Sequence, residues 1–173
     1  FKYYVDGKLT LQSYGGGLEE AIAQVYGAEL LPHSFKIQAE RNDIKIYGFI
    51  GNQNYFKPNK SYQSIFLNGR YIKDKNLTAA ADQSYKGMIP IGRYGFIVLN
   101  IEMDPKLVDV NVHPAKLEVR FEDESKVFKA VYHAIKSSLA KSELVEHVKE
   151  ENENVKINEV EKETNVEKEE VTN

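Results

Sequence analysis

Residues 94–103, YGFIVLNIEM, are almost entirely apolar and contain a single carboxylate. A strand that is buried on both faces needs such a run, whereas a strand with one solvated face alternates apolar and polar residues. The stretch therefore predicts the central strand of a sheet, and the flanking sequence must provide the neighbouring strands and the covering helices.

Neighbouring strands are predicted from alternation and turn residues. Residues 34–50, SFKIQAERNDIKIYGFI, alternate around Asn42-Asp43 and predict a hairpin with one solvated face. Asp6-Gly7 predicts another hairpin over residues 2–12, because Asp-Gly suits a tight type I′ turn. Residues 62–69, YQSIFLNG, predict a strand that ends at Asn68-Gly69, and the polar stretch before it predicts a loop.

Three stretches place apolar residues at helical spacing, at residues 17–26, 76–86 and 122–139. The third begins with acidic residues, which suits the helix dipole, and its expected buried stripe is Val127, Phe128, Val131 and Ile135. The order of strands and helices predicts an α+β fold, a two-layer sandwich with helices on one face of a mainly antiparallel sheet.

Composition bounds the organisation of the chain. The 173 residues suit one domain, contain no cysteine and include no apolar run long enough for a membrane span. Residues 1–140 carry 18 Lys and Arg against 15 Asp and Glu, whereas residues 141–173 carry 5 against 11. We therefore predict a mildly basic domain over residues 1–141 and an acidic, disordered linker over residues 142–173, with a partner-induced helix as the alternative. The strand-like start at Phe1 predicts a domain excised from a longer protein.

The simplest catalytic and metal sites are excluded by the residues present. Without cysteine there is no thiol nucleophile, and the four histidines show no metal-ligand spacing. Glycines 15–17 precede a helix and could bind an anion, but they lack the patterns of nucleotide loops, so a strand-to-helix turn is the simpler interpretation. We predict no catalytic residue, no metal site and no resident cofactor in this chain.

Basic residues lie in two predicted connections. Arg70, Lys73 and Lys75 stand between a strand and a helix, and Arg93 stands in PIGRYG before the central strand. Cations on loops next to tyrosines suit contacts to a phosphate backbone without base reading. An ordinary solvated loop, with Asp74 pairing a neighbour, explains them equally well.

The stretch VDVNVHPAKLEVRF, residues 108–121, begins with strand alternation and is interrupted by Pro114. The proline ends the strand, so Lys116 is expected on a turn where its ammonium can meet a terminal phosphate from outside a nucleotide pocket. An ordinary exposed lysine is the alternative. The face opposite the valines carries Asp109, Asn111 and His113, and we predict that this polar face meets another domain.

The motifs FLNGRYIKD and VDVNVHPAK followed by EVRF resemble the MutL family of DNA mismatch repair proteins, in the transducer domain that follows its GHKL-type ATPase domain. The resemblance spans about residues 60–140. It implies a fold like the second domain of a small-subunit ribosomal protein, with a left-handed βαβ crossover. It also implies that Lys116 contacts the γ-phosphate of ATP in the neighbouring domain, and that Lys73 and Lys75, with Arg70 close by, contact DNA.

The resemblance also implies what lies outside the chain. The ATP- and Mg²⁺-binding segment and the C-terminal dimerisation domain are absent, so the fragment itself should be no enzyme. The full-length protein would bind ATP and Mg²⁺, form a homodimer, bind DNA and the mismatch-recognition protein MutS, and act in the bacterial cytoplasm at the nucleoid. Two alternatives from other classes stay open at this point: a stand-alone nucleic-acid-binding module of ribosomal-protein type, and the transducer of a type II topoisomerase.

Overall fold

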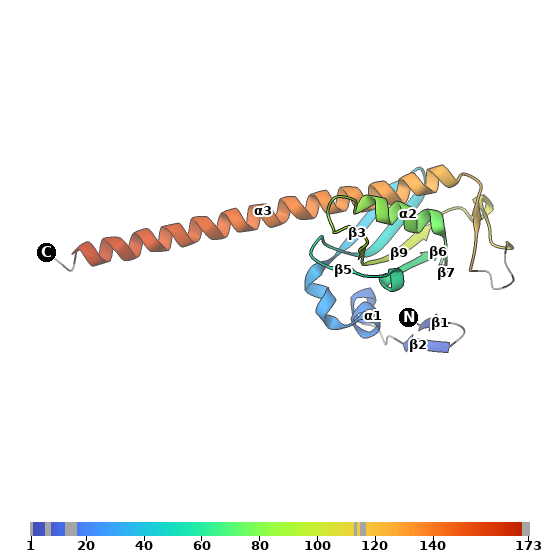
Figure 1. The fold of residues 1–173 in the computed structure, drawn as a ribbon, viewed down its shortest axis with the longest axis horizontal. Helices are drawn as coiled ribbons and strands as arrows, with labels where there is room; N and C mark the ends of the chain where they lie inside the picture. Colours follow the sequence, from blue (N-terminus) through green and yellow to red (C-terminus); the bar gives the residue numbers. More distant parts are fainter. Residues whose placement is uncertain (1, 6–7, 13–16, 113, 115–116, 171–173) are drawn as a thin grey trace. The chain divides into compact units, whose positions relative to one another are not determined.

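A five-stranded sheet organises the first part of the chain (Figure 1). The computed structural model describes residues 2–5, 8–12, 17–112, 114 and 117–170. The chain divides into two units, Phe1–Ser138 and Leu139–Asn173. The sheet and the residues considered as sites belong to the first unit.

Strand β9 lies at the centre of this sheet, as the apolar run predicted. The strand order is β3-β4-β9-β6-β7, in which β6 and β9 run parallel and every other neighbouring pair is antiparallel. The strands are β3 (Ser34–Arg41), β4 (Ile44–Gly51), β6 (Gln63–Leu67), β7 (Arg70–Ile72) and β9 (Ile97–Glu102). The mainly antiparallel α+β fold predicted from the sequence is confirmed.

Two tight turns set the register of the outer strands. Asn42 and Asp43, with φ of 52° and 61°, connect β3 to β4 as predicted. Asn68 and Gly69, with φ of 47° and 81°, do more than end β6, because they return the chain as the edge strand β7. Asn and Gly tolerate this left-handed backbone, which the twist of a two-residue hairpin requires.

Helices α2 (Lys75–Ser84) and α3 (Glu124–Glu170) are neighbours, and the start of α3 lies with α2 over one face of the sheet (Figure 1). The hydroxyl of Ser84 donates to the carbonyl oxygen of Tyr132 at 3.3 Å, and the Gln63 amide donates to Asp82 at 3.0 Å. The chain passes from β6 through β7 and α2 to the parallel strand β9. This is the expected crossover, and its left-handedness stays a prediction.

Helix α1 (Gly17–Tyr26) and the 3-10 helix η1 (Ala28–His33) pack against the opposite face, in addition to the predicted helix layer. Phe49 and Val98 point to that face by strand alternation, and they form one buried cluster with Ile22 and Leu30. The Tyr26 hydroxyl lies 2.5 Å from that of Ser64, which ties α1 to β6. Apolar side chains therefore cover both faces of the sheet where Phe49 and Val98 lie.

Two short strand pairs lie outside the main sheet. β1 (Lys2–Val5) and β2 (Lys8–Gln12) form the predicted N-terminal hairpin, whose Asp6-Gly7 turn lies outside the described residues. β5 (Phe56–Lys57) pairs with β8 (Tyr94–Gly95), so the predicted loop over residues 51–60 contains a short strand and then the 3-10 helix η2 (Lys60–Tyr62).

The alternation predicted over residues 108–113 does not continue through the described residues 110–112. After the 3-10 helix η3 (Pro105–Leu107), β10 (Val108–Asp109) is only two residues long and pairs with β11 (Arg120–Phe121). A carboxylate oxygen of Asp109 accepts a hydrogen bond from the backbone N–H of Asn111 at 2.9 Å, which turns the chain out of the strand. Val112 is consequently 39% exposed rather than buried.

The start of α3 agrees with the prediction. Asp123 accepts from the backbone N–H of Lys126 at 3.0 Å, as an N-terminal cap does, and Val127, Val131 and Ile135 are buried. Phe128, which was expected in the same stripe, is only half-buried.

In the structure α3 continues as a helix to Glu170, whereas the sequence predicts a disordered linker over residues 142–173. In the part of this stretch whose side chains the structure describes, the large apolar residues Leu144, Val145, Val148 and Ile157 are each more than half exposed, so burial does not stabilise the helix there. The linker and its boundary stay predictions. Among the described residues, no helix combines the length and apolarity needed to cross a membrane.

Candidate functional site

The structure brings three of the four predicted DNA-contact cations together. Arg70 is the first residue of β7, Lys73 directly follows this strand, and Lys75 is the first residue of α2. All three side chains are exposed. We call residues 70–75 the basic segment, because it presents three cations within one edge hairpin and the helix start that follows it.

Asn68 fixes the position of the basic segment on the sheet. Its side-chain amide donates to the carbonyl oxygen of Met103 and accepts from the backbone N–H of Met103, both at 3.0 Å. Its own backbone N–H donates to the carbonyl oxygen of Ile101 at 2.8 Å. The asparagine of the NGR motif thus has a structural role, since it holds the hairpin against the end of β9.

Asp74 caps α2 rather than pairing with the lysines beside it. Its carboxylate accepts from the backbone N–H of Leu77 at 2.8 Å, and within the described residues it forms no ion pair. Burial, with a smaller contribution from Glu124, raises the pKa of Asp74 above its ordinary value. The ion pair expected for an ordinary solvated loop is therefore not formed by Asp74.

The raised pKa of Asp74 leads to a prediction for Asp74→Asn. A raised pKa means that the folded chain binds a proton more tightly, so the unfolding free energy falls as pH rises from the ordinary carboxyl pKa through the raised one. Asparagine caps helices as well as aspartate, so this variant should keep its stability at pH 7 and lose that pH dependence. Asp74→Ala, which has no cap, should lose about 1 kcal/mol in chemical denaturation. Loss of stability in both variants would show that the carboxylate charge itself is needed.

A backbone hydrogen bond joins the basic segment to the other motif. The N–H of Lys73 donates to the carbonyl oxygen of Leu117 at 2.8 Å. Leu117 directly follows Lys116, so the predicted phosphate-sensing lysine is adjacent to a residue bonded to the basic segment. Sequence reasoning missed this link, because it is one bond between irregular segments far apart in the chain.

The remaining predicted residues of the HPAK region are only partly described. Asp109 and Asn111 are exposed, and they are joined by the hydrogen bond that forms the turn after β10. His113 and Lys116 lie outside the described residues. The polar face and its proposed partner domain therefore stay a prediction.

Arg93 belongs to a different surface. It lies just before β8, where Gly95 contacts the ring of Tyr85 at the C-terminal end of α2. Lys75 begins the same helix, whose ten residues span about 15 Å. The four cations grouped by the sequence therefore form two surfaces rather than one.

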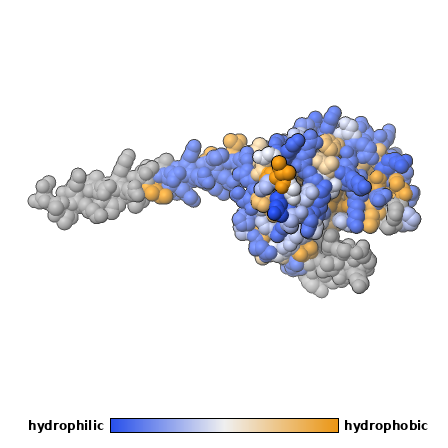
Figure 2. Space-filling model, viewed as in Figure 1, coloured by the Kyte–Doolittle hydropathy of each residue, from blue (hydrophilic) through white to orange (hydrophobic). Residues whose placement is uncertain are grey.

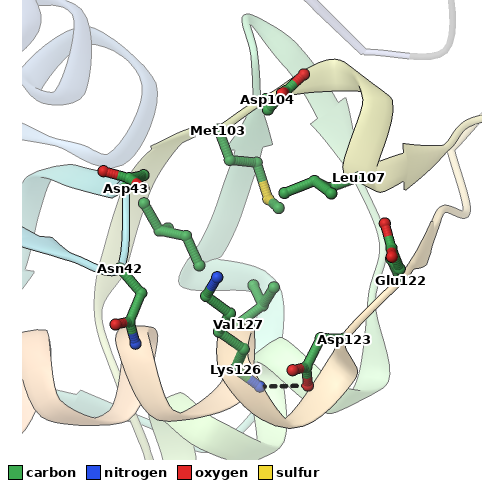
Figure 3. A pocket seen from close by; sticks show the side chains of 10 residues that line it. Asn42, Asp43, Met103, Asp104, Leu107, Glu122, Asp123, Lys126 and Val127 are labelled. Atoms are coloured by element: carbon green, nitrogen blue, oxygen red, sulfur yellow. Dashed lines mark hydrogen bonds between the residues drawn. The ribbon is translucent and has the colours of Figure 1, made fainter.

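A pocket of about 510 Å³ lies where the β3–β4 turn, the end of β9 and the start of α3 meet (Figure 3). Its apolar lining includes Met103 and Leu107, and four carboxylates and one lysine surround it. The polar lining residues are Asn42, Asp43, Asp104, Glu122, Asp123 and Lys126. Negative charge of this density repels a nucleotide triphosphate, so this pocket does not suit ATP. In the part of the chain that the structure describes, no group of three or more His, Asp or Glu is arranged to hold a metal ion.

Comparisons with known proteins identify the family. A model of the family described as "DNA mismatch repair protein, C-terminal domain" matches residues 22–140. The chain is 40% identical over 157 residues to DNA mismatch repair protein MutL of Thermoanaerobacter sp., which covers 90% of this chain and 26% of that protein. It is 41% identical over 153 residues to MutL of Shouchella clausii, covering 88% of this chain and 23% of that protein. The chain thus spans about a quarter of the length of these relatives.

A solved structure shows the same fold. The crystal structure of the N terminal domain of a DNA repair protein aligns with a TM-score of 0.61 at 22% identity, over 72% of this chain and 41% of that one. The sequence matches favour mismatch repair over the ribosomal-type module and the topoisomerase transducer considered from the motifs. This chain belongs to the MutL family of DNA mismatch repair proteins.

Proposed function

We propose that the chain is the transducer domain of a MutL-family protein, which couples ATP binding in a neighbouring ATPase domain to dimer closure and DNA binding. The observation that carries this proposal is the hydrogen bond from Lys73 to Leu117. This hydrogen bond joins the backbone of the basic segment to the backbone of the residue that follows Lys116. A shift of the backbone at Leu117 would therefore act directly on the basic segment.

Lys116 would serve as the sensor of the nucleotide. Its ammonium would form a charge-assisted hydrogen bond to the terminal phosphate only when the two domains are docked. ATP would then favour the docked arrangement, because a ligand shifts an equilibrium by its differential affinity for the two states. The neighbouring domain would bind ATP and Mg²⁺, and this chain would contribute one cation to that site without being an enzyme itself.

The basic segment would contact the DNA backbone. Arg70, Lys73 and Lys75 are exposed, and the hairpin that begins the basic segment is held to the end of β9, so the backbone of this segment needs little ordering to meet phosphates. Lysine contributes a point charge without the forked geometry of arginine, which favours contact with phosphate over base reading. The homodimer, the dimerisation domain, MutS and a cytoplasmic, nucleoid-associated location belong to the same proposal for the whole protein.

The double variant Lys73→Glu/Lys75→Glu tests the basic segment. It should weaken binding of the chain to duplex DNA and lower the slope of log K against log salt by about 1.8, since each lost phosphate contact removes about 0.9. Binding is measured by fluorescence anisotropy of a labelled oligonucleotide over a range of salt concentrations.

The matched control is Lys129→Glu/Lys136→Glu, which makes the same charge change at two exposed positions of α3. It should leave the salt slope almost unchanged. Equal slopes for both double variants would mean that only the net charge matters, and the basic segment would lose its assigned role.

A further inference from the structure

The segment between α2 and β8 forms a well-defined loop over residues 86–93. The N–H of Met88 donates to the carbonyl oxygen of Tyr85 at 2.9 Å, and the N–H of Arg93 donates to that of Pro90 at 3.1 Å. Gly92 has a φ of 77°, the conformation that glycine adopts without strain in such a turn. The tip of the loop is therefore a closed turn over residues 90–93.

Tyr85 anchors the base of this loop. Its side chain is buried, and its hydroxyl donates to the carbonyl oxygen of Gly51 at 2.5 Å. A Cβ atom at Gly95 would lie 2.6 Å from the Tyr85 ring, so the two ends of the loop pack directly on each other. Such a loop can bind a partner with little loss of conformational entropy, because its ends are already fixed.

Ile91 at the tip is 104% exposed. Among the residues of the first unit whose exposure the structure describes, the other exposed large apolar side chains reach 36% to 39%. On the face seen in Figure 2, apolar residues are scattered among hydrophilic ones and do not form a continuous patch. Within the described part of this unit, Ile91 is thus the apolar side chain that protrudes furthest into solvent, and it is not part of an apolar groove.

Cations lie at both ends of this loop and on the strand β5 that pairs with β8. Lys86 and Arg93 at the two ends of the loop are exposed. Lys57, which pairs with Tyr94 in the β5–β8 ladder, lies over the rings of Tyr62 and Tyr55, at 4.5 Å and 5.0 Å from their centroids. Lys60 is close by but forms an ion pair with Asp82 at 2.6 Å, and Glu29 acts on Lys57. The cations outnumber these two carboxylates, so the surface suits an anionic partner.

We propose that the loop over residues 86–93 is a second DNA-contact site, in which Ile91 packs against the face of an unstacked base while Arg93 and Lys86 bind the adjacent phosphates. Apolar side chains such as isoleucine are inserted between base steps by proteins that open a duplex, and single-strand binders likewise combine a cationic groove with side chains that pack on the exposed face of a base. The inference rests on the proposed DNA-binding function, but it concerns a surface separate from the basic segment.

The absence of tryptophan from the sequence allows a direct test. In the 173-residue chain carrying Ile91→Trp, a single-stranded or a duplex oligonucleotide should quench the emission of the only tryptophan, because an indole stacked on a base loses fluorescence. Quenching by the single strand alone assigns a stacking site, and quenching by the duplex assigns an opened base step. The variant Ile91→Ser should bind the same oligonucleotide about five- to tenfold more weakly, as expected for lost apolar burial.

The controls are Leu144→Trp and Leu144→Ser, at a position that is 66% exposed and lies in the second unit. With the same oligonucleotide, the emission of Leu144→Trp should change less than that of Ile91→Trp, and Leu144→Ser should lose less affinity than Ile91→Ser. Unchanged emission of Ile91→Trp with saturating DNA overturns the inference, and so does a blue shift with anionic phospholipid vesicles in place of quenching by DNA. If Lys73→Glu/Lys75→Glu weakens binding while Ile91→Ser does not, the inference fails and the proposed function stands. A wild-type chain that does not bind DNA at low salt overturns both.

Discussion

Replacing Lys116 by alanine in the full-length protein is expected to lower ATP turnover by roughly ten- to a hundredfold. The variant would lose one hydrogen bond between a charged donor and a phosphate, which contributes about 1.5–3 kcal/mol, and each 1.36 kcal/mol corresponds to a tenfold change in rate. Turnover is measured as steady-state phosphate release. The thermal unfolding of this domain should stay unchanged, because the expected role of Lys116 lies in the neighbouring domain.

Lys106→Ala is the matched control, since Lys106 is an exposed lysine shortly before the same region of the chain. It should leave turnover near that of the unmodified protein. Lys116→Arg should recover part of the lost rate, because it restores the charge with a different geometry. Normal turnover by Lys116→Ala would exclude the sensor role, whatever the family resemblance implies.

Gly48→Ala is expected to destabilise the domain by about 3 kcal/mol or more and to lower its Tm by roughly 10 °C. Gly48 pairs with Leu99 at the centre of the β4–β9 ladder and has a φ of 151°. A Cβ atom there would overlap the carbonyl oxygen of Val98, and backbone atoms of the central strand can move only together with the sheet. Chemical denaturation followed by circular dichroism measures the loss.

Gly69→Ala separates the steric effect from the backbone effect. Gly69 also has a positive φ, 81°, but an added Cβ atom would meet nothing within 4 Å. This variant should lose only about 1 kcal/mol, the cost of a side chain in the left-handed region. Similar losses in both variants would mean that the conformation, and not the contact with β9, makes Gly48 necessary.

Local sequence features predicted most of the helices, strands and turns, because each of these forms from residues that lie close together in the chain. The Asn42-Asp43 turn, the apolar central strand and the acidic start of α3 each depend on residues a few positions apart. The strand predicted over residues 108–113 was too long for a reason that is also local, since the Asp109 side chain competes for the backbone N–H of Asn111. The edge strand β7 was missed because three residues are too few to show a periodicity.

The sequence by itself determined the fold class, the tight turns and the motifs that place the chain in its family. The tertiary structure decided which of those motifs lie together. It joined Lys73 to Leu117, separated Arg93 from the basic segment and placed α1 against the face opposite α2. The physical reason is that these arrangements depend on strand order and on single contacts between distant segments, whereas hydrophobic periodicity reports only the face of each element that is buried.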